Sequence, residues 1–119
     1  MSKQNYKNGL YHIALGIPTI RLPNKQITLR YTKHALESAQ MDQYGDIKLP
    51  RSINPSLCQV VEVEMQNNMA VKLLLRMPYN LAYDLCMVIN PDGSVRTVWL
   101  NSKRDKHSTL RAEKYVQHQ

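Results

Sequence analysis

The fold is decided by residues 69–77, which read MAVKLLLRM. The odd-numbered positions are all apolar, whereas Lys72 and Arg76 fall on the opposite side, which is the two-residue period of a strand with one buried face. An Asn-Asn pair precedes the stretch and a proline follows it, so turns are expected at both ends. We predict a strand that packs one face on a helix and presents Arg76 on the polar face or in a cleft.

Three further strand-like runs surround this stretch. They cover about residues 57–66, 82–90 and 95–101, and turn-forming residues separate them. Short connections favour antiparallel neighbours. These four runs therefore predict an antiparallel meander.

A strand and a helix are expected before the meander. Residues 27–31 alternate apolar with polar residues, and Thr32 can cap a helix that runs to about Tyr44 and stops at Gly45. The expected core stripe of this helix is Ala35, Leu36 and Ala39, with His34 roughly opposite. The predicted fold class is α+β: an N-terminal arm and one helix packed on a mainly antiparallel sheet of four to five strands.

The length of 119 residues fits one domain, and 43% hydrophobic residues suffice for a compact core. We divide the chain into an arm (1–26) with one short strand, an α+β domain (27–116) and a tail (117–119). No apolar run is long enough for a membrane helix, and the start lacks the apolar stretch of a secretory signal. We expect no membrane association and a cytoplasmic location, which is the host cytoplasm if the protein is phage-encoded.

The charge of the chain favours a polyanionic partner. Sixteen Lys and Arg against nine Asp and Glu give a net charge of +7, and the densest basic cluster lies between Lys103 and Lys114. Cys58 and Cys86 lie in apolar runs and are expected to be reduced core residues. Zinc-type spacings and glycine-rich phosphate loops are absent, so no metal or cofactor is expected and nucleotide-hydrolysing folds are disfavoured.

Two histidines have cations as neighbours. His34 lies near the predicted helix start, and His107 follows the last predicted strand. Metal-free RNA cleavage needs a base for the 2′-hydroxyl, an acid for the departing 5′-oxygen and positive charge on the phosphorane, and histidine can perform either proton transfer near neutral pH. If the last strand brings His107 close to the helix start, both imidazoles and Arg76 surround one phosphate, with charge added by Lys33, Lys103 or Lys106.

The element order carries a resemblance. The predicted order is a strand, a helix with the sequence YTKHALE at residues 31–37, an antiparallel meander and a final basic segment with a histidine. This order resembles the superfamily of small metal-independent ribonucleases that includes barnase, EndoU, colicin-type nucleases and RelE-like toxins. It also resembles small phage-encoded endoribonucleases. The resemblance covers about residues 27–116. The resemblance does not extend to the ribosome-dependent toxins, because these often lack paired histidines and have denser basic surfaces.

The resemblance implies roles for individual residues. It implies catalysis by His34, phosphate binding by Arg76, and acid or base catalysis by His107 with Ser108 or Thr109 hydrogen-bonding nearby; Tyr115 could substitute in part. The residues expected to bind substrate are Lys33, Lys103, Arg104, Lys106 and Tyr83.

Two other interpretations stay open. The chain could be a non-catalytic phage or mobile-element early protein that binds a host protein or nucleic acid through its basic surface. It could also be an antitoxin or inhibitor whose arm orders on binding. Tyr79 and Tyr83 flank a loop where a base could stack, although the same rings could complete the core.

Overall fold

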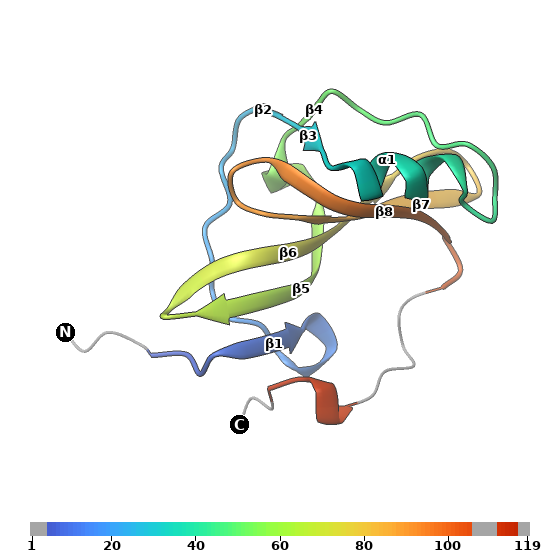
Figure 1. Ribbon diagram of the computed structural model, residues 1–119. Helices are drawn as coiled ribbons and strands as arrows, with labels where there is room; N and C mark the ends of the chain where they lie inside the picture. The colour runs from blue at the N-terminus through green and yellow to red at the C-terminus, as the bar shows by residue number, and fades with distance from the viewer. Residues whose placement is uncertain (1–4, 106–111, 117–119) are drawn as a thin grey trace.

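A computed structural model describes residues 5–105 and 112–116 of the chain (Figure 1). The main sheet has six strands in the order β1 (Gly9–His12), β5 (Gln59–Gln66), β6 (Met69–Pro78), β7 (Tyr83–Ile89), β8 (Ser94–Ser102) and β3 (Arg30–Tyr31). The other elements are β2 (Ile27–Thr28) paired with β4 (Ser52–Ile53), the helix α1 (Lys33–Gln40), and the short 3₁₀ helices η1 (Ile13–Leu15), η2 (Pro55–Leu57) and η3 (Ala112–Lys114). The predicted α+β class, with one helix and a mainly antiparallel sheet, is confirmed. In the described part of the chain, no helix has the length and apolar character needed to cross a membrane.

Strands β5 to β8 form the predicted antiparallel meander. The turn between β5 and β6 is Asn67-Asn68, and both residues have positive φ, at 52° and 63°. A two-residue turn with this backbone matches the twist of the two strands it joins. The Asn-Asn pair therefore sets the register of the longest hairpin.

Helix α1 begins where the sequence predicts and ends earlier. Thr32 caps it, because its Oγ1 accepts the amide of Ala35 at 3.1 Å. The helix stops at Gln40, since the Asp42 carboxylate accepts the amide of Leu100 at 3.1 Å and holds the next turn of chain on β8. The prediction that the helix extends to about Tyr44 was therefore wrong.

The buried face of α1 is narrower than predicted. Ala35 and Ala39 are buried, but Leu36 is 46% exposed, so its predicted place in the core stripe was wrong. The helix continues from β3 alongside β8 and packs mainly on that strand (Figure 1). The two small alanine side chains allow the helix to approach the strand closely, and Ser38 Oγ lies 3.4 Å from Oγ1 of Thr97 beside them.

Residues 27–31 do not form the single predicted strand. They divide at buried Leu29, whose amide bonds to Arg51, while β2 pairs with β4 and β3 runs parallel to β8. Gly93 permits the close approach of this segment to the turn before β8: its φ is +95°, and a Cβ there would lie 2.6 Å from the carbonyl oxygen of Thr28.

The N-terminal segment contains the expected short strand and packs on the main core. β1 runs antiparallel to β5 at the sheet edge, and its Tyr11 is only 2% exposed. Ile17, Ile20 and Leu22 also pack against the main core.

The two faces of the sheet differ. The inner face carries the main core, to which residues such as Val63, Leu75 and Met87 contribute. The outer face carries a smaller cluster of Val61, Leu74 and Cys86, against which Val88 and Trp99 pack half-buried. Both cysteines are free, Cys58 half-buried and Cys86 fully buried, as predicted.

Candidate functional site

A β-bulge in β8 turns two consecutive side chains to the outside. Val95 pairs with Ile89 and Thr97 with Val88, so Arg96 has no partner in β7. Val95 and Val98 are both buried in the main core although they are three residues apart, which a regular strand does not allow. Arg96 and Thr97 therefore both lie on the outer side.

A second bulge has the same effect in β5. Val60 pairs with Leu75 and Glu62 with Leu74, which leaves Val61 without a partner in β6. Val61 enters the outer apolar cluster, and the following Glu62 also lies on the outer face.

The two bulges border an open polar groove between the start of α1 and the outer face of the sheet. Its volume is about 540 Å³. The residues that line this polar groove are Leu10, Thr32, His34, Glu62, Glu64, Lys72, Val88, Arg96 and Thr97. It thus joins one imidazole, two cations and two carboxylates, contributed by α1, β5, β6 and β8.

Internal interactions engage both carboxylates of the polar groove. The Nζ atom of Lys72 lies 3.8 Å from Oε1 of Glu64, a partly exposed pair that contributes little stability. The phenol of Tyr115 donates to Oε1 of Glu62 at 2.5 Å. Burial, and then the neighbouring Glu62 carboxylate, raise the pKa of Tyr115 to about 12. The phenol is therefore a neutral donor that holds Glu62.

His34 and Arg96 differ from the two carboxylates of the polar groove in their exposure and contacts. Both are exposed, and neither the imidazole nor the guanidinium forms a hydrogen bond or ion pair with the residues at 5–105 or 112–116. The first amides of a helix also lack intrahelical acceptors, and the Thr32 cap takes only that of Ala35. The start of α1 therefore adds partial positive charge beside His34. This end of the polar groove suits an anion such as a phosphate group.

Arg76, the predicted phosphate ligand, lies one side-chain row further along the outer face and is engaged. Its guanidinium is nearly buried, and it donates from Nε to Oδ2 of Asp84 at 2.8 Å and from Nη2 to the carbonyl of Ser102 at 3.0 Å. Lys103 binds the other oxygen of Asp84 at 2.6 Å. Burial opposes ionisation of Asp84, but the hydrogen bonds from Lys103 and Arg76 outweigh it and lower its pKa. Two predicted cations therefore share one internal carboxylate.

The remaining predicted residues are spread over the fold. Lys33 is exposed at the start of α1, and Arg104 is exposed after β8. Tyr83 stacks on Tyr44 with ring centroids 4.4 Å apart. Tyr83 pairs with Ser102, five residues beyond Thr97 of the polar groove, which is about 17 Å along the strand. His107, Thr109, Lys106 and Ser108 lie outside the described residues, so the structure does not test their predicted roles.

Sequence reasoning missed Arg96 and the two carboxylates of the polar groove. A signal was present: VRTV at 95–98 places apolar residues three apart, which breaks the period of two. Such a break indicates a bulge, and bulges often re-aim side chains at functional sites.

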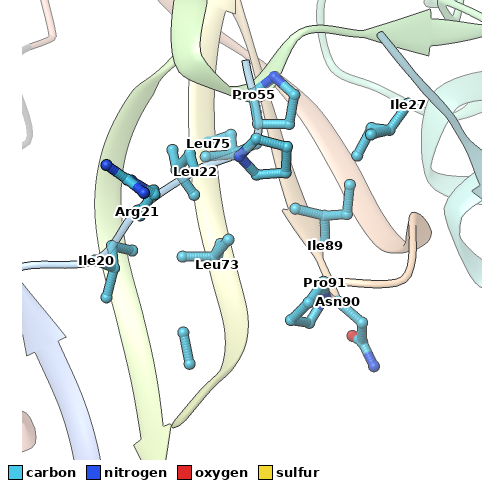
Figure 2. Close-up of a pocket in the computed structure, with 12 residues that line it drawn as sticks. Ile20, Arg21, Leu22, Ile27, Pro55, Leu73, Leu75, Ile89, Asn90 and Pro91 are labelled. Atoms are coloured by element: carbon cyan, nitrogen blue, oxygen red, sulfur yellow. The ribbon is translucent and has the colours of Figure 1, made fainter. Parts of the chain in front are cut away.

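A separate apolar cavity of about 310 Å³ lies between residues 20–23 and the inner face of the sheet (Figure 2). Leu73, Leu75 and Ile89 line one side of it, and Arg21 is the one charged residue in its lining. Asn90 also borders it, and its buried Oδ1 accepts a hydrogen bond from none of the residues at 5–105 and 112–116. This lining is less suited to a polyanion than the polar groove.

Comparison of the chain with protein-family models, with curated proteins and with solved structures finds no match.

Proposed function

We propose that this protein is a metal-independent endoribonuclease that binds RNA in the polar groove and cleaves it by transesterification from the 2′-hydroxyl. The observation that carries the proposal is that His34 and Arg96, both exposed and bonded by none of the residues that the structure describes, border one groove beside a helix start. The net charge of +7 would attract the RNA over longer range.

Each group has a chemical role in this proposal. His34 transfers a proton to or from the reacting oxygens, which is typically worth about 10²–10⁴ in rate. Arg96 donates to the phosphate oxygens and stabilises the phosphorane, as Arg76 was expected to do. The second proton-transfer group is His107, as the sequence predicts, and Glu62 is the carboxylate of the polar groove that could replace it.

The test is incubation of purified protein with RNA in the presence of EDTA. We expect fragments that end in a 2′,3′-cyclic phosphate and begin with a 5′-hydroxyl. His107→Ala and Glu62→Gln then distinguish the two candidates for the second proton transfer, because only the true one should slow cleavage at least about 10²-fold. Intact RNA after prolonged incubation with folded protein would exclude the proposed reaction.

A second candidate function is RNA binding without cleavage. The internal engagement of Arg76 by Asp84 favours it, because a cation expected at the phosphate already has partners. Under this alternative, RNA affinity falls with salt in proportion to the number of phosphates contacted, but no product forms.

A further inference from the structure

Trp99 is the one tryptophan of the chain, and it lies on the outer face of the sheet close to the polar groove. It follows Thr97 by two residues in β8, so the two side chains are on the same face and about 7 Å apart along the strand. That separation is comparable with the spacing of neighbouring nucleotides in an extended strand.

The Trp99 side chain packs on the sheet and stays partly exposed. It pairs in register with Cys86, and it packs against the apolar cluster of Val61, Leu74 and Cys86. It is nevertheless only half-buried, and its indole N–H donates to none of the residues that the structure describes. A ring fixed in this way can receive a flat apolar group with little further loss of side-chain entropy.

Several tyrosines that could stack a base are less available. Tyr83 already stacks on Tyr44, the Tyr79 hydroxyl accepts the amide of Lys48 at 3.0 Å, and the Tyr31 hydroxyl donates to the carbonyl of Pro50. Tyr115 also adjoins the polar groove, but its phenol donates to Glu62 and its ring contacts His12 and the ammonium of Lys114. Trp99 combines partial exposure with a place one side-chain row from the polar groove.

We infer that Trp99 is a stacking subsite for a nucleobase, and that the RNA bound in the polar groove is single-stranded. This inference rests on the proposed function. A base can stack on Trp99 only when it has left its own stack, so a duplex presents phosphates to Arg96 but no base to the indole.

The experiment uses the emission of Trp99, excited at the red edge where tyrosine does not absorb. The probes are a single-stranded oligonucleotide made non-cleavable by 2′-O-methylation, the same strand annealed to its complement, and an abasic strand of equal length. We expect the single strand to quench Trp99, whereas the duplex and the abasic strand bind without quenching. Trp99→Leu should weaken binding of the single strand by about 5- to 150-fold and leave the abasic strand unchanged.

The outcomes separate the two ideas. Binding of the base-bearing strand without quenching of the wild-type protein overturns the stacking subsite, and so does equal affinity of Trp99→Leu and wild type for that strand. If no strand binds at all, the proposed function itself fails. Unchanged affinity of Trp99→Leu for the abasic strand shows that the variant is folded, and the wild-type quenching result does not depend on it.

Discussion

Replacement of Asp84 by asparagine should destabilise the protein severely. Asp84 is 18% exposed, and its partner Arg76 is 6% exposed, so Asp84→Asn removes a carboxylate that pairs with a nearly buried guanidinium. Removal of one partner from a buried pair costs about 3–5 kcal/mol. We expect the free energy of unfolding to fall by about 3 kcal/mol, at the lower end of this range, because the amide oxygen of asparagine can still accept a hydrogen bond from Arg76. Lys103 adds little, since it is 36% exposed.

The assay is urea denaturation of wild type, Asp84→Asn and a matched control, Asp92→Asn. Asp92 pairs with Arg30 at 3.1 Å, but both side chains are more than 60% exposed. Asparagine can also keep the hydrogen bond that Asp92 accepts from the amide of Ser94. We expect the control to unfold close to the wild-type midpoint. If Asp84→Asn also unfolds there, the buried pair does not have the energetic role assigned to it.

The same carboxylate gives a pH signature. Burial opposes ionisation of Asp84, yet the hydrogen bonds from Lys103 and Arg76 bring its folded pKa below 3.8. A depressed folded pKa stabilises the protein above the unfolded pKa, and this contribution is lost as the pH falls through the folded value. The stability difference between wild type and Asp84→Asn should therefore shrink below about pH 3.8. A difference that grows on acidification would contradict this sign.

Three further changes test other parts of the structure. Asn90→Leu removes a buried oxygen that has no donor among the described residues and lies beside an apolar cavity. It should therefore raise the free energy of unfolding by about 1 kcal/mol in urea denaturation, and a loss would contradict the assignment. Gly93→Ala should lower it by about 1–3 kcal/mol, because the new methyl group would meet the carbonyl of Thr28 at positive φ; a neutral effect would refute that contact. Arg96→Ala should reduce the slope of log affinity against log salt for single-stranded RNA by about 0.7, whereas an unchanged slope would mean that Arg96 contacts no phosphate.

The sequence predicted the parts of the fold that depend on local pattern. Residues 69–77 are apolar at every odd position, with Lys72 and Arg76 on the other side, and the Asn-Asn turn has the residue type that positive φ favours, so the meander was predictable. The division of residues 27–31 into two strands could not be predicted, because it depends on Gly93, which is more than sixty residues away in the sequence. The early end of α1 likewise depends on a long-range bond between Asp42 and Leu100.

The candidate site was predicted only in part. His34 was expected to point away from the core, and it lies exposed in the polar groove. Arg76 was placed correctly on the polar face, but its pairing with Asp84 depends on the register of β6 and β7, which alternation alone does not specify. Arg96 lies in the groove because of a bulge, and a bulge is set by sheet pairing.

The most direct test of the central claim is the single-turnover rate of RNA cleavage in EDTA by wild type, His34→Ala and Gln40→Ala. Gln40 is exposed at the far end of α1, so its variant controls for the effect of alanine on the helix. We predict that His34→Ala slows cleavage at least about 10²-fold and that Gln40→Ala cleaves at the wild-type rate. Equal rates for all three proteins would show that the polar groove beside α1 is not where the reaction occurs.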